Sequence, residues 1–165
     1  MKRGLTKSGS AFALAGMAGV LASVMASVAA FADSAPQPNP FAKYADPEGV
    51  VLAVQPDFDV EGGAVRLSIY EEDQFLEEAR AKFQGELNED GFAIVPVGAL
   101  PDGEYAFVAY LDENRDGKLN RSIIGSPKEP FGFSNGVRPK LSKPDFEDAK
   151  VDVVPGSVIV LTIED

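Results

Sequence analysis

The chain has 165 residues and a formal net charge of −11 at pH 7, with 26 acidic and 15 basic residues and neither histidine nor cysteine. Without these two residue types it cannot form a Ser-His-Asp or Cys-His nucleophile system, a disulfide, or the zinc, copper and haem sites that rely on imidazole or thiolate ligands. Oxygen-ligated metal ions and chemistry based on carboxylates or lysine remain open to it.

The first 32 residues have the pattern of an export signal. Three basic residues come first, and residues 11–30 are then apolar apart from serine and glycine. Ala30-Phe31-Ala32 gives the small-x-small pattern that signal peptidase reads, so we expect cleavage before Asp33 and a periplasmic or secreted protein. An uncleaved membrane anchor is the alternative, because the apolar segment is about long enough to span a bilayer.

Cleavage would leave residues 33–165, a one-domain length, with 12 basic and 26 acidic residues and a net charge of −14. Such a charge repels nucleic acid and anionic membrane surfaces, so we expect no nucleic-acid partner and no stable membrane insertion after cleavage. An envelope protein or a glycan is the partner that this location favours. The simpler interpretation is that the surplus carboxylates keep an exported domain soluble.

The processed chain begins with an extended, proline-rich arm, residues 33–48, followed by a domain at residues 49–165. Residues 49–55 form the first predicted strand. Residues 64–70 alternate cleanly between apolar and polar side chains, which predicts a half-buried strand with one wet face.

The next segment, residues 73–87, has apolar residues at both helical spacing and strand spacing. Its apolar residues favour one helical turn at residues 75–79, and the alternation that follows favours a strand to Leu87. Asp90-Gly91 is a hairpin signal, and residues 92–97 form the next predicted strand. Pro96 places that strand at a sheet edge or next to a bulge.

Tyr105 follows a Pro-x-Gly turn and begins a strand, as the tyrosine at the corner of a β-sandwich does when its hydroxyl bonds to upstream backbone. A ligand-facing or catalytic phenol is the alternative function for it. Residues 106–111 are apolar on both faces, so we expect a central strand with the core on one side and covered surface on the other.

The C-terminal part offers an alternating strand within residues 145–154 and a closing strand at residues 158–163. The strand count predicts an all-β fold, a single Greek-key β-sandwich of about seven or eight strands, immunoglobulin-like or transthyretin-like. The long loop at residues 112–145 suits a crossover between sheets better than a hairpin of an up-and-down barrel.

The start of this loop carries half of a calcium-binding motif, D-x-N-x-D-G, with Gly117 at the sharp turn. Side chains or, for the lysine, the backbone carbonyl would supply the ligands from Asp112, Asn114, Asp116, Lys118 and Asn120. The bidentate glutamate expected at the twelfth position is replaced by Ile123, so Glu113 or a carboxylate from another loop would have to substitute. We expect an affinity on the order of 10⁻⁴ to 10⁻³ M for calcium, the one cofactor suggested. The same residues also form ordinary Asx turns without metal.

Later in the loop, Phe131 and Phe133 flank a glycine. We expect them to pin the loop onto the sandwich, with stacking on a sugar or peptide as the alternative. Ser134 precedes Asn-Gly and is predicted to lie in a tight turn, because no base is available to activate it as a nucleophile.

Four motifs follow one another in order over this region: Leu100-Pro-x-Gly-x-Tyr105, Asp112-Glu-Asn114-x-x-Gly117-Lys-Leu, Gly125-x-Pro127-x-Glu129-x-x-Gly132-Phe-Ser-Asn135, and Pro144-x-Phe146-Glu-Asp-Ala149. Together they resemble an exported bacterial family known as domain of unknown function 2141, over about residues 51–165. The resemblance implies a single secreted or periplasmic β-sandwich and no established activity. Members often have a histidine just before the first aspartate of the loop, where this chain has Leu111.

These observations favour an exported, non-catalytic binding or structural module of the cell envelope. The alternative is a small hydrolase or lyase that uses carboxylates, Lys128 and either Tyr105 or Tyr110. A third hypothesis is assembly with another envelope protein through the proline-rich arm or an edge strand.

Overall fold

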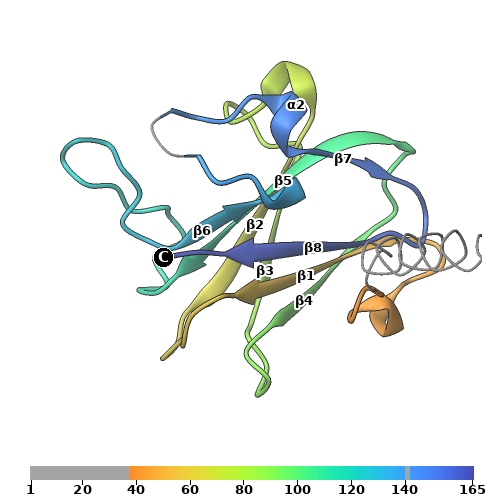
Figure 1. Ribbon diagram of the computed structural model, residues 1–165, viewed down its shortest axis with the longest axis horizontal. Coiled ribbons are helices and arrows are strands. Elements are labelled where there is room, and N and C mark those ends of the chain that lie inside the picture. The colour runs from red at the N-terminus through yellow and green to blue at the C-terminus, as the bar shows by residue number, and fades with distance from the viewer. Residues whose placement is uncertain (1–37, 140–141) are drawn as a thin grey trace, which may run out of the picture. The chain divides into compact units, whose positions relative to one another are not determined.

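In the part of the chain that the structure describes, eight β-strands in two sheets account for most of the regular structure (Figure 1). The structure is a computed structural model that describes residues 38–139 and 142–165, so the predicted export signal lies outside the described residues. The strands are β1 (Val50–Pro56), β2 (Ala64–Tyr70), β3 (Ala81–Gly85), β4 (Ala93–Gly98), β5 (Gly103–Asp112), β6 (Phe131–Phe133), β7 (Lys150–Val153) and β8 (Val158–Ile163). Among the described residues, four short helices accompany them: η2 (Ala42–Tyr44), η3 (Glu72–Gln74), η4 (Ser134–Gly136) and α2 (Phe146–Ala149). The all-β prediction of seven or eight strands is confirmed.

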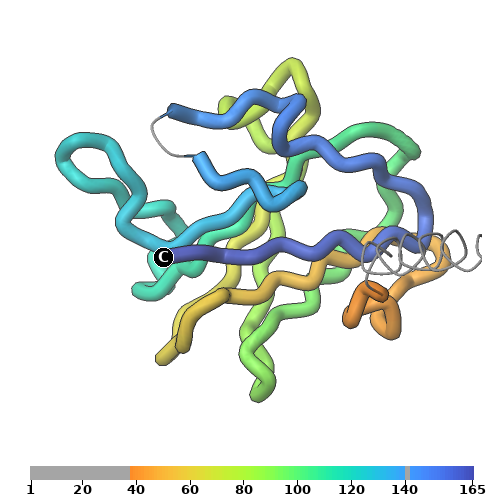
Figure 2. Tube along the Cα trace, viewed as in Figure 1, coloured from red at the N-terminus to blue at the C-terminus, as the bar shows by residue number. Residues whose placement is uncertain are grey.

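The smaller sheet has the order β4-β1-β8, with β1 antiparallel to β4 and parallel to β8. The larger sheet has the order β3-β2-β5-β6, and β7 also pairs with β5. The ten-residue strand β5 is long enough to pair with β7 through its first half and with β6 through its second half. Figure 2 shows the same path as a tube, with the chain leaving β5 into the long loop and returning as β6.

Alternating side chains of both sheets meet in one core. Strand β2 contributes Val65, Leu67 and Ile69, all almost fully buried, while its polar residues face the other way. Phe107 and Leu111 extend the same core from β5. The alternation of apolar and polar residues in β2 therefore places the apolar side chains on the core face and the polar ones on the outward face, as predicted.

The two sheets come together at the edge formed by β6 and β8. Phe131 and Glu164 exchange backbone hydrogen bonds, each with an N–O distance of 3.1 Å. Gly132 follows Phe131 at this contact. A Cβ added there would lie 1.9 Å from the backbone oxygen of Thr162, so only glycine fits where β6 meets β8.

A second apolar cluster covers the outward face of the larger sheet. Phe133, Phe146 and Ala149 are buried there against Ala106 of β5, and Phe131 packs at its margin. Phe131 and Phe133 pack edge to face, with ring centroids 5.8 Å apart. The prediction that they pin the long loop, and the prediction of covered surface beyond β5, are both confirmed.

Strand β4 is an edge strand, as the position of Pro96 predicts. Its register against β1 shifts between Val50 and Val51, which pair with Gly98 and Pro96. Both the predicted edge position and the predicted bulge are therefore present.

Four local predictions were wrong. Residues 146–149, expected as part of a strand, form helix α2 because Asp145 has extended backbone at its start and Glu147 and Asp148 lie in its first turn. The helical turn expected at residues 75–79 lies earlier, in η3, and the strand after it ends at Gly85 instead of Leu87. Strand β6 interrupts the predicted long loop, because three residues find partners in β5 and at Glu164.

The segment before β1 packs on the domain from Asn39 onward. Phe41 is buried, and its ring contacts that of Phe92 edge to face at 5.1 Å. Within the described ranges, no helix is both long and apolar enough to cross a membrane.

Candidate functional site

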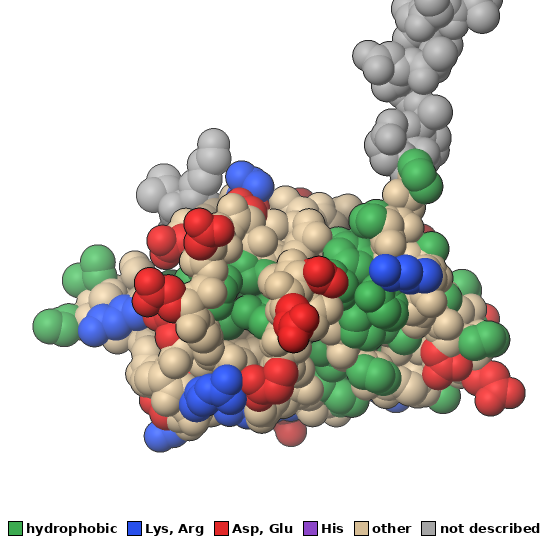
Figure 3. All heavy atoms as spheres, turned by 90° about the horizontal axis from the view of Figure 1, so that it is seen from below, with side chains coloured by type: hydrophobic (Ala, Val, Ile, Leu, Met, Phe, Trp, Pro, Cys, Tyr) green, Lys and Arg blue, Asp and Glu red, His purple; other side chains and the backbone are tan. Residues whose placement is uncertain are grey.

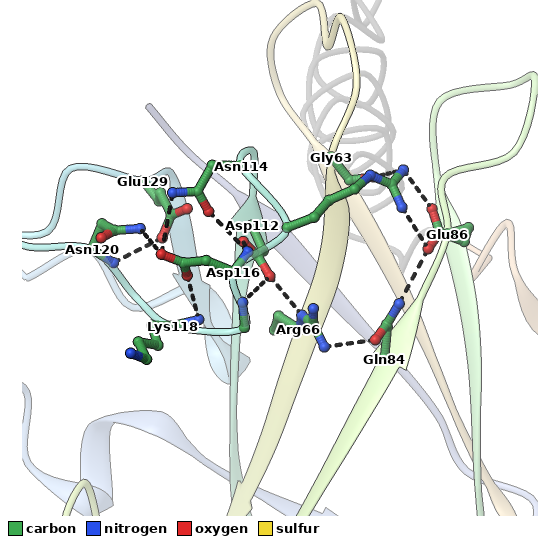
Figure 4. Close-up of polar contacts among 12 residues, drawn as sticks. Gly63, Arg66, Gln84, Glu86, Asp112, Asn114, Asp116, Lys118, Asn120 and Glu129 are labelled. Atoms are coloured by element: carbon green, nitrogen blue, oxygen red, sulfur yellow. Dashed lines mark hydrogen bonds and ion pairs between the residues drawn. The ribbon is translucent and has the colours of Figure 1, made fainter.

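The acidic loop after β5 is organised around the buried carboxylate of Asp112 (Figure 4). Its Oδ1 accepts a hydrogen bond from the backbone N–H of Asp116 at 3.0 Å, and its Oδ2 accepts one from Gly117 at 2.9 Å. The chain turns back through two left-handed residues, Arg115 with φ 59° and Gly117 with φ 77°. Asp112 therefore closes the turn with its side chain.

Arg66 of β2 completes the environment of Asp112. Its Nε donates to Asp112 Oδ2 at 2.8 Å, and its Nη1 donates to Gln84 Oε1 at 2.6 Å. The pair neutralises a carboxylate whose side chain has no exposed surface, which would otherwise be costly to bury. The start of the loop is thereby fixed to the sheet.

Asn114, Asp116 and Asn120 form a second set of contacts in the loop. Asp116 Oδ1 accepts from the N–H of Lys118 at 2.8 Å, and its Oδ2 accepts from the side-chain amides of Asn114 and Asn120 at 3.2 and 3.1 Å. The side-chain hydrogen bond from Asn120 and the backbone hydrogen bond from Lys118 lower the pKa of Asp116 below its ordinary value. Its carboxylate is therefore held in the charged form.

Arg115 fixes the outer side of the turn. It forms an ion pair with Glu86 beyond β3, at 2.9 Å, and donates to the carbonyl of Gly63 at 2.8 Å. The hydrogen bond from Arg115, followed by that from Gln84, lowers the pKa of Glu86. The loop is therefore attached to two neighbouring turns as well as to the sheet.

Glu129 is a further candidate ligand, which the spacing of the D-x-N-x-D-G motif does not predict. It comes from the far arm of the loop, is 6% exposed, and its Oε2 accepts from the N–H of Asn120 at 2.9 Å (Figure 4). Its Oε1 is buried without a hydrogen-bond partner. A buried carboxylate oxygen with no donor is uncommon, and a cation is one partner that would satisfy it.

The predicted calcium ligands therefore lie close together in the fold, but their oxygen atoms are not equally free to bind a metal ion. Asp112, Asn114, Asp116 and Asn120 share one hydrogen-bond network, which Lys118 joins through its backbone. Arg66 and two N–H groups already engage both oxygens of Asp112, whereas Glu129 retains a free oxygen. Among the described residues, no three acidic side chains are placed to hold a metal ion together. An oxygen-seeking cation would thus depend on amide and carbonyl oxygens beside Asp116 and Glu129.

The two tyrosines considered for catalysis lie on opposite faces of β5. Tyr105 is buried on the core side of β5, and its hydroxyl donates to the carbonyl of Pro101 at 3.2 Å, which confirms the tyrosine corner. Tyr110 lies on the opposite face of the same strand, where burial and then the charge of Asp112 raise its pKa. Tyr110 therefore keeps its proton at neutral pH.

Ser134 has a structural role. It is fully buried, its Oγ accepts from the N–H of Phe107 at 2.9 Å, and its hydroxyl donates to the carbonyl of Ala149. It lies in the turn of η4, where Asn135 has a φ of 59°. Ser134 thus joins β5 to the end of α2 through its two hydrogen bonds. It lies in a turn, as predicted.

Comparison with known proteins places the chain among relatives without a described activity. The model of one bacterial family, described as "Uncharacterized protein conserved in bacteria (DUF2141)", matches residues 56–160, which is more than half of the chain. No curated protein and no solved structure matches it significantly. The family match covers β2 to β7 and the whole acidic loop, including Asp112 and Glu129. The chain therefore belongs to the DUF2141 family.

Proposed function

We propose that the protein is an exported, non-catalytic binding or structural module of the cell envelope, whose acidic loop takes up calcium weakly. The signal-like first 32 residues support export to the periplasm or the outside. The calcium proposal is carried by one observation, the buried and unpartnered Oε1 of Glu129 beside Asn120. Glu129 would take the role that Ile123 cannot take at the twelfth position of the motif.

The hydrogen bonds that the ligand oxygens already accept explain why calcium binding would be weak. Asp112 is committed to Arg66, so the site would lack one of its strongest ligands and would have a guanidinium nearby. We therefore expect a dissociation constant on the order of 10⁻⁴ to 10⁻³ M. In such a site calcium would steady the loop, which already has its shape, and would add little to the sheets.

Thermal unfolding with calcium and with a chelator tests the metal part. At a calcium concentration about ten times the dissociation constant, the stabilisation is about 1.4 kcal/mol, which corresponds to a midpoint increase of about 5 °C in a domain of this size. The increase should disappear in Glu129→Gln and persist in Glu113→Gln, which changes the charge of an exposed neighbour. An unchanged midpoint at millimolar calcium would exclude the calcium site.

Export is tested separately. The full chain is expressed in a bacterial host, and the protein from the periplasm or the medium is weighed by mass spectrometry. We expect a chain that begins at Asp33. A full-length chain retained in the membrane fraction would support the uncleaved anchor instead.

A further inference from the structure

A groove of about 930 Å³ lies on the outward face of the larger sheet. Strands β2, β3 and β5 form its floor, and residues between 117 and 127 form one wall. Residues 142–144 contribute to the other side. The groove lies beside the acidic loop, and the main core is on the opposite face of the sheet.

The strand registers arrange the floor of the groove in two cross-strand rows. Reading across β3, β2, β5 and β6, these rows are Gln84-Arg66-Tyr110-Phe131 and Lys82-Ser68-Val108-Phe133. Each row begins with a long polar or charged side chain at the exposed edge and ends with an aromatic ring at the covered side. The floor therefore offers amide, hydroxyl, cationic and aromatic groups within one surface.

The charge of the groove is opposite to that of the protein. Among the described residues that line it, none is acidic, and five are basic: Arg66, Lys82, Lys118, Arg121 and Lys143. The processed chain as a whole carries 26 acidic and 12 basic residues. On the face drawn in Figure 3, acidic side chains are spread among basic and apolar ones. A concave positive surface in so acidic a protein selects for an anionic ligand.

Four of the five basic residues of the groove have no acidic partner among the described residues. Arg66 is paired with Asp112, but no ion pair joins any of the other four to a described residue. Basic residues that do form ion pairs elsewhere lie outside the groove: Arg80, Arg115, Arg138 and Lys150. In Figure 4, the ammonium group of Lys118 lies apart from the polar network that its backbone joins. These charges are therefore available to a ligand.

The backbone of the floor limits the class of ligand. Strand β2 is paired on both sides, by β3 and β5, and β5 is paired by β2 on one side and by β6 and β7 on the other. Their N–H and C=O groups are used within the sheet, so an extended peptide could add as a strand only at the outer edge of β3 and not over the middle of the floor. Over β2 and β5 recognition must use side chains, and hydroxyl, amide and aromatic groups beside cations suit a sugar ring that carries acidic groups.

We propose that this groove binds an anionic oligosaccharide, with Lys82, Lys118 and Arg121 on its acidic groups and Tyr110 beneath a sugar ring. The proposal rests on the proposed export, since it needs the protein to meet glycans of the envelope, and does not depend on calcium. Carboxylate and sulfate groups share the required chemistry, and the experiment separates them.

Calorimetric titration of the protein beginning at Asp33 tests the proposal; its residues Asn39–Asp165 form a compact unit of their own. The probes are oligogalacturonate, a heparin-derived oligosaccharide and a neutral cello-oligosaccharide of equal length, with polyglutamate as an anionic control without sugar. Each is used with calcium and with chelator. We expect binding of one or both acidic probes, loss of most of it at about 0.5 M salt, and none of the neutral probe. Oligogalacturonate alone would indicate carboxylate groups, and the heparin fragment alone would indicate sulfate groups.

Matched variants locate the binding surface. Lys82→Gln combined with Arg121→Gln should weaken binding about tenfold, because two exposed ion pairs are lost. Lys128→Gln removes the same kind of charge from the same loop outside the groove and should leave the affinity unchanged. An equal loss of affinity in the double variant and in Lys128→Gln would show that the groove is not the binding site.

The remaining outcomes are decisive as well. Absence of binding to both acidic probes, or equal binding of the neutral probe or of polyglutamate, would overturn the proposal. Failure here, with cleavage before Asp33 and the calcium-dependent midpoint observed, would remove the glycan ligand and leave the proposed function standing. Glycan binding by a protein that is retained uncleaved in the membrane would instead remove the proposed export.

Discussion

The Asp112 carboxylate and the Arg66 guanidinium meet at 2.8 Å, between neighbouring strands and at the point where β5 becomes the acidic loop. Asp112 is fully buried, whereas the Arg66 side chain is 26% exposed and reaches the groove. One ion pair thus links the turn at Gly117 to the floor of the proposed binding surface. The motif that first indicates calcium therefore has a structural role in the fold with or without metal.

Replacing Asp112 should destabilise the protein more than any other change in the loop. Asp112→Ala removes the acceptor of two backbone N–H groups and the partner of Arg66, so the free energy of unfolding should fall by about 3–5 kcal/mol. Chemical denaturation measures the change. Glu113→Ala, at an exposed neighbour, should change it by less than about 0.5 kcal/mol. A similar small effect for both variants would show that the network contributes little.

The tyrosine corner predicts a smaller effect. Tyr105→Phe keeps the ring in the core and removes the hydrogen bond to Pro101, so it should cost about 1 kcal/mol in denaturant unfolding. Tyr44→Phe is the matched control because Tyr44 lies partly exposed and packs on Phe92 through its ring. Equal stability of Tyr105→Phe and the unchanged protein would mean that the corner is held by packing alone.

Acid should loosen the loop before it unfolds the sheets. The folded state lowers the pKa of Asp116 and of Glu86, so each contributes stability above its ordinary pKa, near 4, and this contribution is lost as the pH falls through the folded values. Hydrogen exchange of the loop amides, followed from neutral pH to about pH 3 and corrected for the intrinsic rate, measures this. Asp116→Asn should remove part of the pH dependence. An identical pH profile in that variant would contradict the assignment.

Local patterns in the sequence predict much of the fold. The alternation in residues 64–70 predicts β2 because a strand places successive side chains on opposite faces. The turn before Tyr105 and the proline at position 96 predict a corner and an edge because each acts on its own neighbours. These features need no knowledge of distant residues.

Features that depend on distant partners could not be predicted. Alternation places Arg66 on a wet face, but its partner Asp112 lies 46 residues away in sequence. Strand β6 has three residues and exists through pairing with β5 and contact with Glu164. Pairing of β6 with β5 brings the long loop back to the sheet. The burial of Glu129 and the basic side chains that the loop adds to the groove follow from this pairing. Composition therefore indicates an acidic protein and conceals its basic surface.

The crossing of β6 and β8 gives the sharpest prediction about packing. In Gly132→Ala the new Cβ would lie 1.9 Å from the Thr162 carbonyl oxygen, a backbone atom that cannot move without breaking the contact between Phe131 and Glu164. We expect a loss of about 3 kcal/mol in the free energy of unfolding, measured in urea. Gly62→Ala is the control, since a Cβ there has no atom within 4 Å, and it should change stability by less than about 0.5 kcal/mol. If Gly132→Ala were as stable as Gly62→Ala, the two sheets could not be in contact at this edge.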